Sequence, residues 1–410
     1  MSDAASPESS QDESIVRVAV LSDIHAFHGP AKGEPPSYAD EAKAEDQWRQ
    51  HPFPGLTALI KTSKLKADLL LCCGDLADKA EPGAMKYCWA FLNETAKLLG
   101  ARLCATAGNH DIDSRYGYNA FDARGMMQNL TPTFPVREGR LADQYWARQF
   151  CIVQSGSWRL VLVNSAAYHG QGSDDAQPPE YAHGRIAQST IERLKDALTP
   201  PTNAAVNLLA IHHHPMAIGG VDEDGSYMAN GEALIDLLAM DRQMWLIIHG
   251  HRHVPRLLHG QGGNNAPLLF GCGSFSALLR GRWATSAGNQ FYMLEFPIGA
   301  ASSLGLPLVG RFRSWDWHIG LGWEHATESS GLPGAGGFGC REHSGAVATK
   351  VADLVRKRSP ATVSWLEVLA KYPQFEFLMP ADIARVRTEL ESSKSIRVQW
   401  GAGYPTELSL

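Results

Sequence analysis

Five short polar motifs, each directly after an apolar stretch, hold the residues of this chain that can do chemistry. They are Asp23-Ile24-His25, Gly74-Asp75, Gly108-Asn109-His110-Asp111, His212-His213-His214-Pro215 and Gly250-His251-Arg252-His253. Carboxylate, amide and imidazole groups bind transition-metal ions and serve as acids and bases in hydrolytic sites. An apolar run that stops abruptly in such groups is typical of a strand ending at the edge of a sheet, where open α/β sheets bind ligands. The motifs together predict a metal site.

Buried strands of a sheet must position these motifs. The apolar runs before them cover residues 15–21, 67–73, 101–107, 204–211 and 245–248. Stretches predicted to be helices lie between the runs, at residues 55–63, 79–99, 186–198 and 231–240. Further strands are predicted in a hairpin at 150–164 and at 266–270, 290–296 and 308–317. Strands that alternate with helices predict an α/β fold.

Two long segments follow candidate metal ligands without a clear strand or helix pattern. Residues 26–54 are polar and contain several prolines, and they form either a rim or lid over the site or a tolerated surface insertion. Residues 113–145 lack periodicity, and their aromatic side chains either wall a pocket or form core beneath a loop. We expect substrate specificity to reside in these two segments.

The composition is that of a globular protein, with 44% hydrophobic and 20% charged residues among 410. The formal net charge is −6, from 37 basic and 43 acidic residues, and no block rich in lysine and arginine occurs. These features argue against a dedicated nucleic-acid-binding protein, whose surface would be basic. No apolar run reaches the ~20 residues that a membrane-spanning helix needs.

The seven cysteines are odd in number, form no C-x-x-C pair and lie mostly in apolar runs. They predict buried free thiols in a reducing compartment rather than a disulfide framework. The first 14 residues are acidic and polar, without the apolar core of a secretory signal, and predict a disordered tail. We therefore expect a cytoplasmic protein without membrane contact.

Four regions are expected along the chain. The tail at residues 1–14 precedes a catalytic domain at 15–326, and the Gly-rich residues 327–345 are predicted to be a linker. Residues 346–410 contain apolar residues at helical spacing and are predicted to form a helical appendage. The appendage either packs on the domain as a strap or mediates self-association, so a homo-oligomer is left open.

The order of the five motifs, D-x-H, G-D, G-N-H-D, H and G-H-x-H, resembles that of the calcineurin-like metallophosphoesterase superfamily. The resemblance covers residues 16–296, and five ordered motifs make it specific. Asp111 after His110, together with the His-His-Pro block, points to the branch of class III cyclic-nucleotide phosphodiesterases and glycerophosphodiesterases. The implied fold is a four-layer αββα sandwich of two mixed β-sheets flanked by helices, here with a C-terminal helical appendage.

The resemblance also implies two divalent transition-metal ions held close together. It assigns one ion to Asp23, His25, Asp75 and His253, and the other to Asp75, Asn109, His213 and His251. Asp75 is the expected bridge, because a carboxylate with two oxygens can bind both ions and offset part of their charge. His213 is selected because the motif reads H-x-P and because alternation along a strand end would turn His212 and His214 away. Mixed imidazole and oxygen ligands indicate Mn, Fe or Zn rather than Ca or Mg.

The implied reaction is the hydrolysis of a phosphodiester or phosphomonoester of a small molecule or nucleotide. The metal pair would lower the pKa of a bound water towards ~7, so that metal-bound hydroxide attacks phosphorus in line with the leaving oxygen. His110 would stabilise the phosphoryl charge or protonate the leaving group, and Asp111 would orient His110. A nuclease is the alternative activity, which the acidic charge disfavours. The alternative from a different functional class is a scaffold protein that keeps the fold but has lost catalysis. It is disfavoured because each motif position holds the residue that the resemblance expects.

Overall fold

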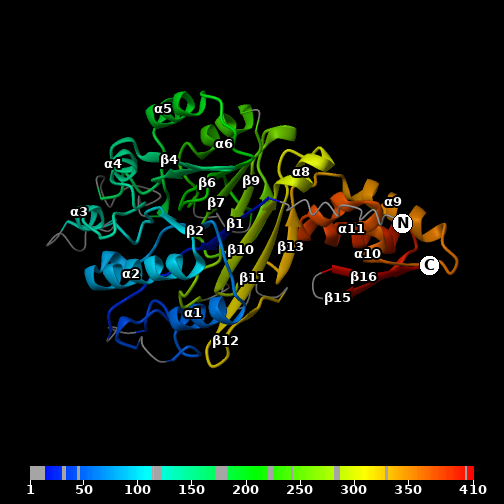
Figure 1. Ribbon diagram of the computed structural model, residues 1–410, viewed down its shortest axis with the longest axis horizontal. Helices are drawn as coiled ribbons and strands as arrows, with labels where there is room; N and C mark the ends of the chain where they lie inside the picture. Colours follow the sequence, from blue (N-terminus) through cyan, green and yellow to red (C-terminus); the bar gives the residue numbers. More distant parts are fainter. Residues whose placement is uncertain are drawn as a thin grey trace, which may run out of the picture.

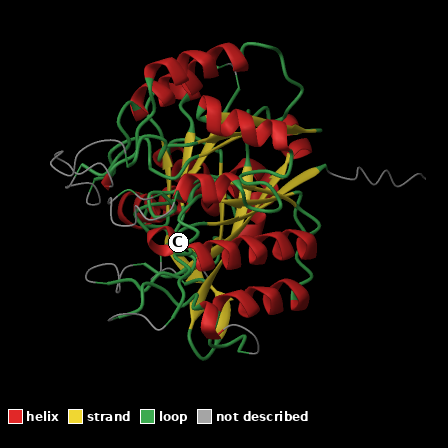
Figure 2. Cartoon of the chain, turned by 90° about the vertical axis from the view of Figure 1, so that its left-hand side faces the viewer, coloured by secondary structure: helices red, strands yellow, loops and turns green. Residues whose placement is uncertain are grey.

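Two mixed β-sheets form the centre of the protein, and helices flank them (Figures 1 and 2). The computed structural model describes residues 14–29, 34–43, 47–112, 114, 122–170, 182–219, 225–241, 243–280, 287–327, 331–401 and 404–410. The first sheet has seven strands in the order β12-β11-β10-β1-β2-β3, with β13 paired to β11. They are β1 (Ile15–Leu21), β2 (Leu69–Cys72), β3 (Arg102–Ala105), β10 (Gln290–Pro297), β11 (Gly310–His318), β12 (Gly322–His325) and β13 (Ala335–Phe338).

The second sheet has six strands in the order β4-β5-β6-β7-β9-β8. They are β4 (Phe150–Ser155), β5 (Trp158–Val163), β6 (Val206–Ala210), β7 (Trp245–His249), β8 (Arg256–His259) and β9 (Leu268–Gly271). Strands β5, β6, β7 and β9 are parallel in this sheet, as β1, β2 and β3 are in the first. The strands that precede the five motifs therefore run parallel within each sheet, so their carboxyl ends share an edge.

Neighbouring side chains of the second sheet enter two different hydrophobic cores. Leu208 in β6 and Leu246 in β7 pack in the core between the sheets, together with residues of β1 and β2. Their successors, Leu209 and Ile247, pack beneath the helices on the outer face. Because both faces of these strands are buried, the strands read as continuous apolar runs, and this is why the sequence predicts them.

The helices complete a four-layer αββα arrangement, as the resemblance predicts. Apolar residues of α1 (Pro52–Thr62) and α2 (Pro82–Leu99) join the core of the first sheet, and those of α5 (Gln188–Leu198) and α6 (Gly231–Met240) join the outer core of the second. The shorter helices are α3 (Ala123–Gln128), α4 (Gly139–Arg148) and α8 (Ile298–Leu304). No described helix combines the length and apolar character needed to cross a membrane. All seven cysteines are buried and free, which confirms the prediction of buried thiols.

The C-terminal region is an appendage with its own core, on the right in Figure 1. It contains the predicted helices, here α9 (Ser344–Arg356), α10 (Trp365–Lys371) and α11 (Pro380–Ser393). It also contains a three-stranded antiparallel sheet that the sequence reading missed, formed by β14 (Thr362–Ser364), β15 (Arg397–Gly401) and β16 (Tyr404–Ser409). Nε and one Nη of the Arg311 guanidinium donate to the two Glu376 carboxylate oxygens at 2.6 and 2.8 Å, which ties the appendage to β11.

The Gly-rich stretch before the appendage is not a linker over its whole length. Residues Ala335–Phe338 form β13, an antiparallel partner of β11. A Cβ atom on Gly336 would lie 2.3 Å from the Phe312 ring, and one on Gly337 would lie 2.0 Å from the Glu376 carbonyl oxygen. The linker prediction for 327–345 is wrong there because these glycines permit close packing rather than flexibility. Residues 328–330, and the predicted tail except Ser14, lie outside the described residues.

Candidate metal centre

The five motifs meet where the carboxyl ends of the parallel strands of both sheets come together. Asp23, Asp75 and Asn109 follow β1, β2 and β3 of the first sheet, and His212 and His251 follow β6 and β7 of the second. Potential donor atoms in this cluster lie within 4.8 Å of one another in several groups of three residues. The structure thus brings the predicted ligands, which are far apart in sequence, into one buried cluster.

The first set of donors surrounds His25. Its Nε2 atom lies 3.1 Å from His253 Nε2 and 3.5 Å from Asp75 Oδ2. His253 Nε2 in turn lies 3.4 Å from Asp23 Oδ1. Donor atoms bound to a single ion through bonds of ~2.1 Å lie roughly 3 to 3.5 Å apart, so these four side chains fit one cation.

The second set of donors surrounds Asn109. Its Oδ1 atom lies 3.1 Å from His212 Nε2 and 3.2 Å from His251 Nδ1. His212 Nε2 also lies 3.3 Å from Asp75 Oδ2, the same oxygen that approaches His25. One oxygen of Asp75 is therefore shared by the two sets, as an atom that bridges two cations would be.

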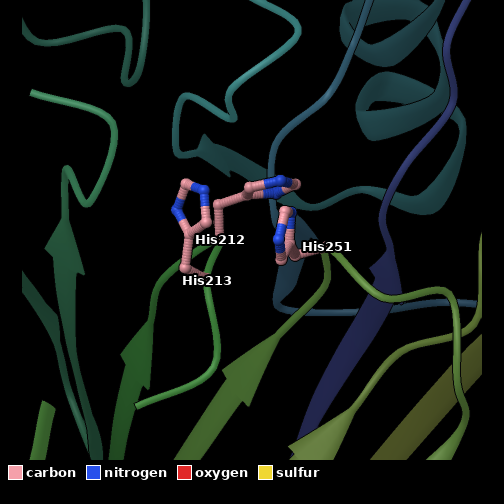
Figure 3. Close-up of side chains that lie close together, drawn as sticks. All are labelled: His212, His213 and His251. Atoms are coloured by element: carbon pink, nitrogen blue, oxygen red, sulfur yellow. The ribbon is translucent and has the colours of Figure 1, made fainter. Parts of the chain in front are cut away.

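The imidazole nitrogen that lies beside Asn109 and Asp75 belongs to His212, whereas the sequence predicts His213 as the ligand. His213 still belongs to a group with His212 and His251 whose donor atoms lie within 4.8 Å of one another. Figure 3 shows the rings of His212, His213 and His251 gathered at the ends of their strands. His212 Nδ1 lies 2.7 Å from the Cys73 carbonyl oxygen, which fixes the ring with Nε2 towards Asp75. His213 Nδ1 instead lies 2.8 Å from Ser165 Oγ. Alternation along a strand does not govern these side chains, because β6 ends at Ala210 and the chain bends at residues 212 and 213.

The signal for His212 in the sequence is that it directly follows the apolar run at residues 204–211. His212 is the second residue after β6 and Asp75 is the third after β2, so in both sheets a donor residue closely follows the end of a strand. Ser165, which holds His213, follows β5 in the same way and was missed, because a lone serine after a strand carries no specific signal.

The burial and charge of the donor residues favour bound cations, because buried carboxylates need positive partners. Asp23 and Asp75 are buried, and within the described ranges neither carboxylate forms an ion pair with a lysine or arginine. Burial opposes their ionisation, but His253 beside Asp23 and His212 beside Asp75 outweigh it and hold both pKa values below the ordinary range. Burial, with His110 nearby, lowers the pKa of His25 to about 3. Transition metals prefer ionised carboxylates and neutral imidazoles. His25 is already neutral near pH 7, whereas Asp75 outweighs burial and raises the pKa of His212 to about 9, so His212 must lose a proton when it binds an ion.

The backbone conformation of the donor residues also indicates a metal site. Asp23, His25, Asp75, His251 and His253 all adopt left-handed conformations, with φ between 50° and 78°. Such conformations cost of order 1–3 kcal/mol each in non-glycine residues and concentrate at ligand sites. The fold therefore accepts strain in order to point these donors at a common centre.

His110 lies beside the centre and is oriented by Asp78, not by Asp111. Its Nδ1 atom lies 2.9 Å from Asp78 Oδ1, and its ring packs edge-on against His25 with a centroid distance of 4.5 Å. Burial raises the pKa of Asp78, but the hydrogen bond and the charge of His110, together with the charges of His25 and Lys79, bring the pKa below the ordinary value. The backbone N–H of His110 donates to Asp75 Oδ1 at 2.7 Å, which links the ring to the bridging carboxylate.

The prediction that Asp111 orients His110 is wrong. Asp111 is fully buried, and its carboxylate accepts hydrogen bonds from the backbone N–H groups of Leu76 (2.7 Å), Ala77 (3.2 Å) and Gly108 (2.9 Å). Burial and the charge of Asp75 raise its pKa to about 7. Asp111 therefore joins the loop after β2 to the loop after β3 and keeps the G-D and G-N-H-D motifs in contact.

The described part of the segment 26–54 is tied to the rim of the centre. The Phe27 N–H donates to the Ala39 carbonyl oxygen at 3.1 Å, and the Tyr38 N–H donates to the Ser276 carbonyl oxygen at 2.8 Å. Ser276 Oγ donates to the carbonyl oxygen of Ile24, which lies inside the first motif. The segment thus packs beside the centre, which favours a rim over a loosely attached insertion. Residues 30–33 and 44–46 lie outside the described residues.

Comparison with known proteins agrees with this geometry. A family model described as calcineurin-like phosphoesterase matches residues 16–255, which include all five motifs. The chain is 24% identical over 249 residues to a probable cyclic nucleotide phosphodiesterase from Psychrobacter arcticus, covering 60% of this chain and 77% of that protein. It is 27% identical over 243 residues to a 3′,5′-cyclic adenosine monophosphate phosphodiesterase from Pseudomonas aeruginosa, covering 59% of this chain and 71% of that protein.

Solved structures with a similar course of the chain include a dimetal phosphatase from Danio rerio. The TM-score is 0.43 at 12% identity, covering 68% of this chain and 94% of the other. A purple acid phosphatase from yellow lupin gives a TM-score of 0.44 at 14% identity, covering 73% of this chain and 52% of the other. Because the family model spans more than half of the sequence, the chain belongs to the calcineurin-like phosphoesterase family, whose members are metal-dependent phosphoester hydrolases.

Proposed function

We propose that this chain hydrolyses phosphodiesters of small nucleotides, with 3′,5′-cyclic nucleotides as the first candidates, at two divalent transition-metal ions. The observation that carries the proposal is the position of Asp75 Oδ2, 3.5 Å from His25 Nε2 and 3.3 Å from His212 Nε2. We assign Asp23, His25, Asp75 and His253 to one ion and Asp75, Asn109, His212 and His251 to the other. Imidazole and oxygen donors in these sets favour Mn, Fe or Zn.

The cations, when bound, supply Lewis-acid activation of a water molecule and of the phosphoryl group. The protein's own contribution is to hold the substrate and move a proton. Asp78 holds Nδ1 of His110, which leaves Nε2 as the nitrogen that meets the leaving oxygen or a phosphoryl oxygen. Asp111 keeps the loops of the G-D and G-N-H-D motifs together and so maintains the relative position of the Asp75 carboxylate and His110.

The substrate class rests on the relatives and on the charge of the chain. Two of the similar proteins are described as cyclic nucleotide phosphodiesterases, and we take a small nucleotide of this kind as the substrate class. The net charge of −6 disfavours the alternative of a nuclease, because long nucleic acids bind chiefly through basic surfaces. A silent scaffold would not need five ligand residues in strained backbone around buried carboxylates.

A substrate panel tests the proposal. The purified chain, loaded separately with Mn, Fe or Zn, should hydrolyse a cyclic nucleotide and a generic aryl phosphodiester faster than a phosphomonoester and leave single-stranded DNA intact. Asp75→Asn, which keeps the shape but removes the charge of the shared carboxylate, should abolish the activity. Degradation of DNA with no turnover of small diesters would replace the proposal with a nuclease, and absence of all hydrolysis would favour a scaffold.

A further inference from the structure

A buried ring nitrogen beside the proposed metal ligands has no hydrogen-bond partner among the described residues. The His213 side chain is fully buried, and its Nε2 atom makes no hydrogen bond within the described part of the chain. Its ring centroid lies 4.4 Å from that of His251 and 4.8 Å from that of His212. Buried polar atoms are nearly always paired, so an unpaired one at a reaction centre indicates a partner outside the protein chain, which is a substrate, a water or an ion.

The His213 ring is held firmly in this orientation. Nδ1 lies 2.8 Å from Ser165 Oγ, and Ser165 itself is fully buried at the end of β5. On another side Gly184 presses against the ring, since a Cβ atom there would lie 2.4 Å from Nδ1. The ring therefore cannot turn Nε2 towards a different partner without moving its neighbours.

The contact with Ser165 is compatible with a ring hydrogen on Nε2. Ser165 Oγ accepts a hydrogen bond from the backbone N–H of His213 at 3.2 Å. Its hydroxyl hydrogen can then be donated to His213 Nδ1, at 2.8 Å. In that arrangement the ring hydrogen is on Nε2, which is a donor without a lone pair for a metal.

The donors around the second cation are complete without His213. His212 Nε2 and His251 Nδ1 both approach Asn109 Oδ1, at 3.1 and 3.2 Å, whereas His213 makes no such contact with Asn109 or Asp75 among the described residues. His213 still belongs to a group of three with His212 and His251 whose donor atoms lie within 4.8 Å of one another. His213 is thus close enough to the second donor set to reach an oxygen that is bound there.

We propose that His213 is a substrate-contacting residue that donates its Nε2 hydrogen to a phosphoryl oxygen, and that it is not a metal ligand. Ser165 is the positioning residue that keeps the donor on Nε2. The inference rests on the proposed function to the extent that the bound oxyanion belongs to a phosphoester. A fixed donor aimed at a developing oxyanion contributes on the order of 10²-fold to the rate.

Two substitutions at this position separate the roles. In His213→Asn the amide can still pair with Ser165 but no atom replaces Nε2, whereas in His213→Gln the amide nitrogen can take the place of Nε2. We would measure manganese stoichiometry and the affinity for inorganic phosphate by calorimetry, and then kcat. His318→Asn, at an exposed histidine on β11, serves as the control.

H213N should retain the manganese content of the parent protein, bind phosphate at least tenfold more weakly and lose roughly 10²-fold in kcat, with partial recovery in H213Q. Loss of one manganese equivalent in H213N would overturn the inference by making His213 a ligand. Parent-like phosphate binding and turnover in H213N would overturn it by removing the contact. If H213N behaves as expected towards phosphate while the parent hydrolyses no nucleotide, the inference stands and the proposed substrate class fails.

Discussion

His110 pairs with Asp78, whose Oδ1 atom lies 2.9 Å from His110 Nδ1, although Asp111 is its neighbour in the chain. Asp111 turns its carboxylate inwards to three backbone N–H groups of two loops. Two carboxylates near one histidine thus have separate tasks, since Asp78 orients the ring and Asp111 holds the loops that carry it. The first two predictions test this division.

Asp78→Asn should lower kcat by about 10- to 100-fold without changing the metal content, because the ring of His110 loses its charged hydrogen-bond acceptor. Combining it with His110→Asn should cost little more than His110→Asn alone, since the two residues act as a unit. Steady-state kinetics with parallel metal analysis checks this, with Asp143→Asn on the exposed face of α4 as the control. A parent-like kcat in Asp78→Asn would remove Asp78 from the chemistry.

Asp111→Asn should instead lower the free energy of unfolding by about 1–3 kcal/mol, because an amide nitrogen cannot accept from the buried N–H groups that the carboxylate satisfies. Asp78→Asn should lower it by less than Asp111→Asn does, because the Asn oxygen can still accept from His110 Nδ1 and Asp78 satisfies one partner rather than three buried N–H groups. Urea unfolding of the metal-free proteins measures both values. Equal stability of the parent and Asp111→Asn would show that the carboxylate does not join the loops.

Manganese binding at the second set should strengthen with pH, by about tenfold per pH unit between pH 6 and 8. Burial opposes charge on His212, but Asp75 outweighs it and raises the pKa of His212 to about 9. The ring is therefore protonated below that pH in the metal-free protein, and the ion must displace the proton. His25, whose pKa is about 3, is already neutral in this range and adds no such dependence.

Calorimetry in buffers of different ionisation enthalpy counts the displaced protons. We expect release of about one proton for the second ion, and no such release in His212→Asn. Affinity for both ions that does not vary with pH would argue against His212 as a ligand.

Gly250→Ala should remove the ion held by the first set and destabilise the fold by more than about 2 kcal/mol. A Cβ atom there would lie 2.0 Å from Ser22 Oγ and 2.3 Å from Asp23 Oδ2, so the Asp23 carboxylate must move. Gly139→Ala is the matched control, because no atom lies within 4 Å of its Cβ position. Full metal content in Gly250→Ala, measured by elemental analysis alongside thermal unfolding, would contradict the close approach.

The sequence predicts the parts of this protein that depend on local pattern. Strands buried on both faces read as apolar runs, and each run that ends in a polar motif places that motif at the sheet edge. The role of Asp78 was not predictable, because no local spacing distinguishes it from a surface residue beside Lys79. The choice between His212 and His213 depends on a bend after Ala210, and the strand at Ala335–Phe338 depends on the close approach of Phe312 and Glu376. These features arise from tertiary contacts that the sequence pattern does not record.

The central claim is that one carboxylate, Asp75, joins two cations. Electron paramagnetic resonance of the manganese-loaded protein tests it directly, because two manganese ions bridged by one carboxylate are exchange-coupled and give a multi-line spectrum distinct from that of isolated ions. We predict two manganese ions per chain with a coupled spectrum, and loss of the coupling in Asp75→Asn. A parent spectrum of isolated ions, or a coupled spectrum that survives in Asp75→Asn, would contradict the account.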